Sequence, residues 1–417
     1  MEKSGKFRLT SLERNWILYD VGNSAFVLMV ATLIPIFFNA LAAAGGLSSV
    51  EYLAYWGYAS SAVTIITAVL SPILGTVADT KGFKKPIFIL CVFVGIVGCC
   101  AMGAVSAWLP FLVIFVIAKV GFSGSLVFYD SMLSDVTAPE RMDEVSSRGY
   151  AWGYIGSCVP FVVCLGLVLG AGSIGISQMT ALNLALLLTA AWWLLTTLPL
   201  LKSYKQLYYV EVEKHAVRQS FARIGHTLRH LPEDKQVFWF LLAFFCYIDG
   251  VYTIIDMATA YGTALGLDTT GLLLALLVTQ IVAFPSALVF GRLSNKYPSA
   301  KLIPVCIAAY AGIAVFAFFL TRQWQFWVLA VIVGMFQGGV QALSRSHFAK
   351  IIPPEKSGEY FGLFDICGKG ASFLGTMIVS VGSQLTGSAN VGVGSLILLF
   401  IVGFVLFRVS CRQSETA

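Results

Sequence analysis

The chain has 417 residues, of which 58% are hydrophobic and only 12% are charged, with a formal net charge of +6. A soluble globular chain carries roughly 25% charged residues, so this composition excludes an ordinary soluble domain and favours a chain surrounded by lipid. The basic residues lie in short segments between apolar runs. That distribution is typical of membrane topology rather than of a nucleic-acid partner.

Apolar runs predict an all-α, multi-pass membrane protein. A spanning helix needs roughly 20 apolar residues. The first run is much longer than a signal-peptide core of roughly 7–15 residues, so we expect its helix to remain in the protein. In chain order the expected helices are 16–41, 51–79, 86–106, 108–133, 147–171, 178–201, 236–264, 270–292, 299–320, 325–349, 358–382 and 389–409.

Lysine and arginine predict the orientation of these twelve transmembrane helices. If the N-terminus is cytoplasmic, Arg322 is the one basic residue in an outer loop. This distribution satisfies the positive-inside rule. We therefore expect both termini in the cytoplasm, with the protein in a bacterial inner membrane.

One long polar segment, 202–235, divides the chain. It separates an N-terminal six-helix half, 1–201, from a C-terminal six-helix half, 236–417. Apolar residues recur at helical spacing from Val217 to Leu231, with arginines between them. This pattern predicts an amphipathic helix on the inner membrane surface; a flexible tether is the alternative.

The two halves repeat each other in sequence. Gly75 and Asp79 recur 216 positions later as Gly291 and Asn295, and Pro139-Glu140-Arg141 recurs 215 positions later as Pro354-Glu355-Lys356. Such a duplication is expected when two halves are related by an axis along the membrane normal.

The segment from Gly75 to Lys85 resembles the major facilitator signature loop, G-x-x-x-D-x-x-G-[RK]-[RK]. Glycine allows close helix approach and tight turns, and a carboxylate can pair with basic groups or cap a neighbouring helix. We expect this loop to hold the cytoplasmic ends of the halves together in one state. The predicted conformational gate comprises Gly75, Asp79, Lys81, Gly82, Lys84, Lys85, Arg148 and Arg345.

A closer resemblance covers nearly the whole chain. The opening from Trp16 to Phe26 matches W-x-x-Y-D-x-x-N-S-A-F, and the run from Gly338 to Ser346 reads GGVQALSRS. Both are similar to motifs of the vacuole-effluxer-like family of the major facilitator superfamily. The resemblance implies that the first, fourth, seventh and tenth helices line a central cavity.

Polar residues inside the bilayer are costly, so they usually face a cavity or a partner. We predict that Asp249 carries the coupling proton, with Asp256 as second choice, and that Lys119 attracts a carboxylate. Asp365 and Lys369 are four residues apart and can instead form a structural ion pair. Arg345 can instead pair with Asp20 or Asp130. The full predicted substrate and ion site comprises Asp20, Asn23, Lys119, Asp130, Asp249, Tyr252, Asp256, Gln337, Gln341, Asp365 and Lys369.

These features predict a secondary active transporter of a small polar or zwitterionic, amino-acid-like solute that works by alternating access and is coupled to protons. An amphiphile such as a lysolipid or drug is an alternative cargo. A receptor or scaffold without transport is a further alternative. The chain shows no nucleotide or metal motif, so we expect no enzyme activity, cofactor or metal, and a monomer in the lipid bilayer.

Overall fold

The computed structural model describes residues 7–211, 227 and 229–416. Within these ranges the chain is helical, apart from connections and one isolated bridge between Thr80 and Val210. The α-helices and two short 3₁₀ segments are α1 (Ser11–Ala31), α2 (Leu33–Ala44), α3 (Ser49–Ala78), α4 (Lys84–Met102), α5 (Trp108–Ser131), α6 (Leu133–Val136), η1 (Pro139–Arg141), α7 (Met142–Leu169), α8 (Gln178–Ser203), α10 (Lys235–Ala264), α11 (Thr269–Leu293), α12 (Ser299–Phe318), α13 (Gln323–Ile351), η2 (Pro354–Lys356), α14 (Ser357–Thr386), α15 (Ala389–Gly394) and α16 (Ile397–Thr416).

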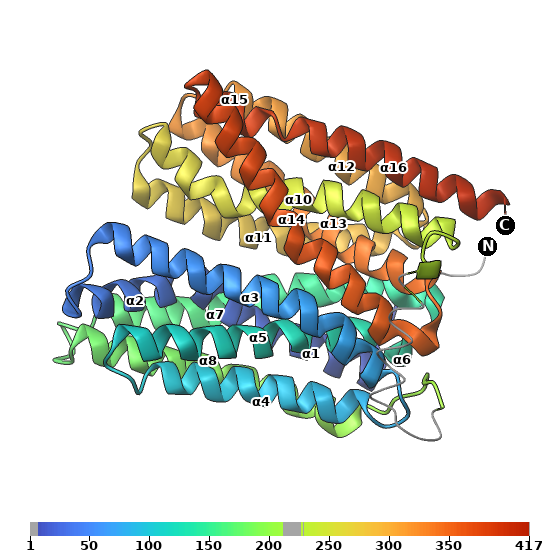
Figure 1. Ribbon diagram of the computed structural model, residues 1–417, viewed down its shortest axis with the longest axis horizontal. Coiled ribbons are helices and arrows are strands. Elements are labelled where there is room, and N and C mark those ends of the chain that lie inside the picture. Colours follow the sequence, from blue (N-terminus) through green and yellow to red (C-terminus); the bar gives the residue numbers. More distant parts are fainter. Residues whose placement is uncertain (1–6, 212–226, 228, 417) are drawn as a thin grey trace.

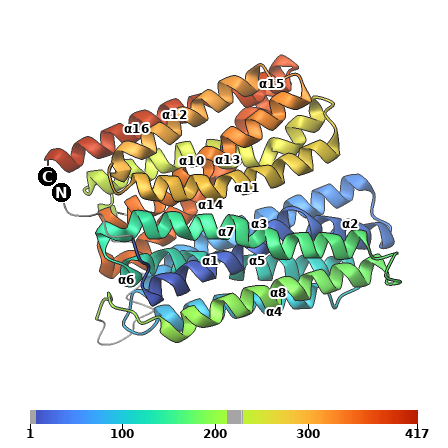
Figure 2. The same ribbon diagram turned by 180° about the vertical axis from the view of Figure 1, so that it is seen from behind.

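The helices form two groups that run side by side. Helices α1–α8 make one group and α10–α16 make the other, and the described chain begins and ends at the same end of the molecule (Figures 1 and 2). Across the boundary α3 packs against α14, and α7 packs against α11 and α13. The groups lie closest together at the end that carries the termini (Figure 1).

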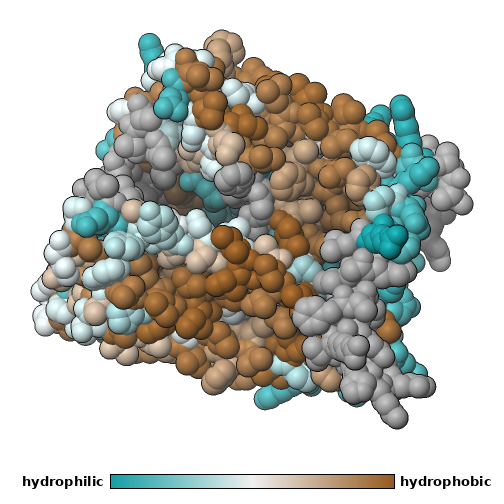
Figure 3. Space-filling model, in the orientation of Figure 1, coloured by the Kyte–Doolittle hydropathy of each residue, from teal (hydrophilic) through white to brown (hydrophobic). Residues whose placement is uncertain are grey.

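Eleven helical segments of the described chain are long and apolar enough to cross a membrane. The twelfth expected segment, α14, has 30 residues and is not among these eleven. Apolar side chains cover the middle of the surface, and polar side chains gather at the end with the termini (Figure 3). This surface is what an all-helical, multi-pass membrane protein requires.

The first helix differs from the predicted 16–41 at both ends. It begins at Ser11 because Thr10 and Glu13 form a capping box: the Thr10 hydroxyl accepts from the Glu13 backbone N–H, and the Glu13 carboxylate accepts from that of Thr10. Reciprocal capping extends the helix into polar sequence. The helix is then interrupted at Thr32, before Pro35, because proline has no N–H to donate.

Most of the amphipathic helix predicted between Val217 and Leu231 lies outside the described residues. The division of the chain into halves at 202–235 therefore stays our proposal about domain organisation. The described start of that segment, residues 204–211, is an extended strap that packs back on the first group of helices.

Candidate functional site

A buried guanidinium joins the two groups of helices at their closed end. Arg345 on α13 is 2% exposed, and its Nη1 lies 3.0 Å from Asp130 Oδ1 and 3.6 Å from Asp20 Oδ2. Its Nε donates to the Ser146 hydroxyl at 2.9 Å, and Nη2 donates to the Ser146 carbonyl at 3.0 Å. We call these four residues the Arg345 cluster. A buried charge needs paired and hydrogen-bonded neighbours, and here three helices of the other group supply them.

Aromatic rings enclose the same guanidinium. Its carbon lies 4.3 Å from the ring centre of Tyr150 and 4.7 Å from that of Trp16. The Tyr129 hydroxyl donates to Asp20 at 3.0 Å, and its ring stacks on Trp16 with centroids 4.3 Å apart. Ring faces attract cations, so this wall stabilises the buried Arg345 guanidinium.

The internal repeat explains why Asp130 and Arg345 meet. The two positions are 215 residues apart, which is the offset between the repeated motifs. Equivalent positions of two symmetry-related halves can touch only near the axis that relates them. The 3.0 Å contact therefore places the Arg345 cluster close to the centre of the molecule, where the halves must separate for this end to open.

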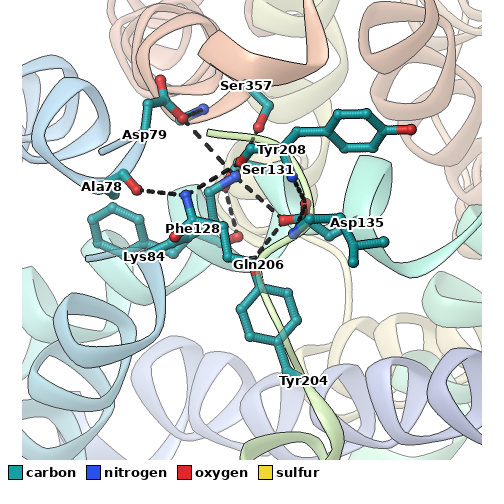
Figure 4. A network of polar contacts seen from close by, with 12 residues as sticks. Ala78, Asp79, Lys84, Phe128, Ser131, Asp135, Tyr204, Gln206, Tyr208 and Ser357 are labelled. Atoms are coloured by element: carbon teal, nitrogen blue, oxygen red, sulfur yellow. Dashed lines mark hydrogen bonds and ion pairs between the residues drawn. The ribbon is translucent and has the colours of Figure 1, made fainter. Parts of the chain in front are cut away.

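The signature loop makes a second contact between the groups. Both carboxylate oxygens of Asp79 accept backbone N–H groups at the first turn of α14, from Gly358 at 2.7 Å and Glu359 at 2.8 Å. Lys84 Nζ lies 3.9 Å from Asp79 and donates to Ser357 at 2.8 Å (Figure 4). A helix N-terminus favours a carboxylate. The predicted capping and pairing roles of Asp79 are both present.

Asp135 was not among the predicted site residues, yet it organises this region. Its Oδ2 accepts from the Tyr204 hydroxyl at 2.6 Å and lies 3.4 Å from Lys84, and its Oδ1 accepts the backbone N–H groups of Leu207 and Tyr208, each at 3.0 Å (Figure 4). Both carboxylate oxygens of Asp135 therefore have partners, and these bonds hold the strap beside the signature loop. No sequence signal identified Asp135, because two of its partners are backbone groups.

The rest of the predicted gate attaches the loop to the strap. Gly82 has φ of +80° and donates its N–H to Gln206 Oε1 at 3.0 Å. Lys85 donates to the Tyr204 carbonyl at 3.4 Å. Lys81, with its side chain 62% exposed, pairs with Glu211 at 3.5 Å. The described contacts of these three residues hold the loop within the first group of helices, so for them the gate role becomes one of positioning.

The second copy of the loop makes the matching contact. Asn295 Nδ2 donates to Glu144 Oε2 at 2.6 Å, and Glu144 also pairs with Arg148 at 2.6 Å. Arg148 is therefore connected to the contact between the groups through Glu144. Nearby, Asp143 accepts from Ser346 at 2.6 Å and pairs with Lys350 at 2.6 Å, again between the groups. Asp143 and Glu144 were also missed by the sequence prediction.

Asp249 does not lie where we predicted. Its carboxylate is fully buried and accepts the backbone N–H of Gly375 on α14 at 2.9 Å and the Thr253 hydroxyl at 3.3 Å. Both partners belong to the C-terminal group of helices, so Asp249 faces the packing between α10 and α14. In this conformation the prediction that it faces an open cavity together with Lys119 is wrong, because sequence depth does not fix which face of a helix is covered.

The remaining predicted residues surround the boundary between the groups. Tyr252 is half-buried and lies within electrostatic range of Asp130, Asp256 and Asp365. Asp256 is exposed, and Asp365 accepts from Ser71 of the other group at 2.8 Å. The side chain of Lys369 is outside the described residues, so its pairing with Asp365 stays a prediction.

Three further predicted positions have local partners. Lys119 Nζ lies 4.6 Å from the ring centre of Phe122. Asn23 donates to the Tyr19 carbonyl at 3.1 Å, within α1. Gln341 accepts from Tyr154 across the groups at 2.9 Å. Asn23 therefore serves helix α1, whereas Gln341 joins the halves.

Comparison with known proteins places this geometry in a family. The model of the vacuole effluxer Atg22-like family matches residues 11–416. The chain is 41% identical over 414 residues to the uncharacterized MFS-type transporter YxiO of Bacillus subtilis (strain 168), covering 98% of this chain and 97% of that protein. It is 27% identical over 283 residues to autophagy-related protein 22 of Saccharomyces cerevisiae (strain ATCC 204508 / S288c), and this match covers 58% of this chain and 53% of that longer protein.

Solved structures show the same fold. The human organic anion transporter MFSD10 (TETRAN) aligns with a TM-score of 0.72 at 14% identity, over 95% of this chain and 99% of that one. The transporter FucP in its outward conformation aligns with a TM-score of 0.71 at 16% identity, over 96% and 97%. The chain therefore belongs to the vacuole effluxer Atg22-like family of the major facilitator superfamily, and it is a multi-pass membrane protein of the secondary transporter class.

Proposed function

We propose that this transporter moves a small zwitterionic, amino-acid-like solute by alternating access, and that Asp130 carries the coupled proton. The observation behind the proposal is the position of Asp130. Its side chain is 20% exposed, whereas that of Arg345 is 2% exposed, so Asp130 lies at the edge of the closed Arg345 cluster. We further propose that the closed end, the strap and both termini are cytoplasmic and that the conformation is outward-open.

Two carboxylates share one guanidinium in this cluster. Arg345 pairs with Asp130 at 3.0 Å and with Asp20 at 3.6 Å. If Asp130 takes up a proton, its ion pair is lost, while Asp20 keeps Arg345 from being an uncompensated buried charge. The link between α5 and α13 then weakens, and the closed end can open. Proton uptake at Asp130 is thus connected directly to the conformational change.

We propose that the solute binds to polar side chains beside the Arg345 cluster. An ammonium group can lie near Asp256 and Asp365, which both lie within electrostatic range of Tyr252. A carboxylate can approach Lys119 on α5, the helix that carries Asp130. Opposite charges favour opposite poles of a zwitterion, and the family resemblance supports the same class of solute.

Transport into proteoliposomes tests the proposal. Purified protein is reconstituted and supplied with radiolabelled amino acids and an inward pH gradient of one unit. One proton per neutral solute supports about tenfold accumulation at such a gradient. Asp130→Asn preserves size and hydrogen bonding but cannot gain or lose a proton. We expect this variant to lose accumulation while it still exchanges labelled for unlabelled solute.

Asp268→Asn is the matched control, because Asp268 caps α11 and asparagine caps helices equally well. The control should accumulate solute like the wild type. Accumulation by Asp130→Asn at the wild-type level would refute the proton role of Asp130. Failure of every amino acid to exchange through the wild-type protein would refute the proposed solute class.

A further inference from the structure

A pocket opens inside the C-terminal group of helices, apart from the Arg345 cluster. It offers about 60 Å³ to the centres of water-sized spheres, several times the roughly 10–15 Å³ that a single water needs. All of its lining residues lie between Thr253 and Leu396, on α10 to α14 and the chain that follows. A cavity for a transported solute would be lined by both groups of helices. This pocket therefore belongs to one half alone.

The described pocket lining is mostly apolar and carries no charge; its polar members are Thr253, Tyr261, Thr279, Gln280 and Gln337. Its walls include Ile254, Leu276, Phe326, Leu329 and Val333, and among the described lining residues there is no Asp, Glu, Lys, Arg or His. A charged ligand would lose its hydration there without a compensating charge. The lining therefore favours a neutral ligand and disfavours a zwitterion.

The hydroxyl groups of the lining already have partners. Tyr261 donates to the Ala317 carbonyl at 2.6 Å, and Thr279 donates to the carbonyls of Ala275 and Ala330 at 3.0 and 3.2 Å. Thr253 donates to Asp249 at 3.3 Å. These groups complete the protein's own hydrogen bonding and leave little for a ligand to satisfy.

Gln337 is different. It lines the pocket and is only 5% exposed, and within the described chain its Oε1 has no hydrogen-bond partner. The side chain of Tyr154 of α7, in the other group of helices, lies close to it. A buried carbonyl without a partner costs free energy, and a donor placed in the pocket would remove that cost.

We infer that this pocket binds a small, neutral, largely apolar molecule that carries one N–H or O–H group, and that this group donates to Gln337 Oε1. Gln337 is among the residues that the sequence assigned to the solute site, but the described lining contains none of the charged groups proposed above to bind the solute or the proton, so the inference does not depend on proton coupling. Occupancy also bears on the other half of the protein, because Tyr154 of α7 lies close to Gln337 and its hydroxyl donates to Gln341 of α13 at 2.9 Å. A bound ligand would therefore favour the conformation in which α7 and α13 are in contact.

Two matched probes test the inference. Indole has an apolar ring body and one N–H donor, and 1-methylindole has the same body without the donor. Binding is followed by thermal unfolding of the purified full-length protein, since a ligand specific for the folded state raises its apparent stability. We expect indole to bind about fivefold more tightly than 1-methylindole, as for one neutral hydrogen bond. Gln337→Leu should abolish that preference.

A filling variant tests the location. Ala330 lines the pocket and is 8% exposed, so Ala330→Phe should abolish binding of both probes. Val328→Phe is the control, because Val328 lies on the same helix but is 38% exposed and is not part of the lining. Unfolding temperatures without probe show whether each variant is folded, and Val333→Phe replaces Ala330→Phe if that variant is not.

Equal binding of the two probes by the wild type, or unchanged binding by the folded filling variants, would overturn the inference. So would the absence of stabilisation at saturating indole. Binding of indole is measured without transport, and Asp268→Asn, which lies outside the lining, should bind indole like the wild type. The proposed amino-acid transport can therefore fail while the pocket inference stands, and the reverse also holds.

Discussion

Single carboxylates carry much of the contact between the two halves, and Asp79 is the most completely enclosed. It is fully buried and accepts two backbone N–H groups of α14, with Lys84 3.9 Å away. Burial raises the pKa of Asp79 to about 7, although Lys84 and the two N–H groups oppose this effect. The exposed carboxyl group has a pKa of roughly 3.9. At a pH between these two pKa values, burial of Asp79 is therefore accompanied by proton uptake at its carboxyl group.

The sign of the resulting pH effect follows from linkage. Because the pKa of Asp79 is higher in the closed state, its contribution is fully present below the ordinary pKa and is lost as the pH rises through about 7. We expect the unfolding temperature of the wild type to fall between pH 5 and pH 8, by about 1 °C for each kcal/mol lost. Asp79→Asn should show a flatter profile. A variant profile parallel to that of the wild type would assign the effect to another group.

At the scale of elements, the strap connects the end of α8 to the signature loop. Val210 donates its N–H to the Asp79 carbonyl at 2.8 Å, and Gln206 Nε2 donates to the Ala78 carbonyl at 3.1 Å. These bonds satisfy the carbonyls at the C-terminus of α3, which have no partner within the helix. The strap thus gives the loop a fixed shape from which Asp79 can reach α14.

Hydrogen exchange of residues 204–211 tests the role of the strap. Asp135→Ala removes the acceptor for Tyr204, Leu207 and Tyr208, so we expect the strap amides to exchange at least about tenfold faster, as for a loss of about 1.4 kcal/mol. Tyr204→Phe should give a smaller increase, since one hydrogen bond contributes about 1 kcal/mol. Tyr208→Phe is the control, because only the backbone of Tyr208 bonds Asp135. Unchanged exchange in Asp135→Ala would mean that packing alone holds the strap.

Much of the fold could be predicted from the sequence, because lipid requires long apolar helices. The capping contact of Asp79 was also predictable, because the signature loop places a carboxylate at a fixed spacing from two glycines and beside a helix end. Asp249, Asp135 and the strap were not. Their partners include backbone N–H groups, which any residue can offer. Counting residues gives the depth of Asp249 in the membrane, but the face of α10 that it occupies is set by the packing of α14.

At the scale of the whole molecule, glycines determine how closely the halves meet. A side chain at Gly75 of α3 would collide with the backbone of Gly358 on α14, and one at Gly362 would lie 2.7 Å from Pro72 Cα. The repeat provides the same contact on the other side, where a side chain at Gly291 would lie 2.9 Å from Ser147 Cβ. Both contacts lie between the groups, so small residues on both sides of the molecule permit closure of this end.

Gly75→Leu should therefore keep α3 and α14 from packing closely, so that the two groups of helices separate at this end. If the halves rock as rigid bodies, opening this end must close the other. Two reporters in a background without the nine native cysteines measure both ends. Ser147→Cys is fully buried at the closed end, and Asp256→Cys is exposed. We expect maleimide labelling at position 147 to rise about tenfold, as for a shift of about 1.4 kcal/mol, and labelling at position 256 to fall.

The direction of the two changes is what distinguishes alternating access from simple loosening. Gly57→Leu is the control on the same helix, because no atom lies within 4 Å of a side chain added there; it should leave both labelling rates unchanged. A general loss of packing in Gly75→Leu would raise labelling at both positions, and that result would contradict rigid-body rocking. If labelling rises at position 147 and falls at position 256, the two ends of the molecule must be coupled through the groups of helices. This coupling distinguishes a transporter from a channel.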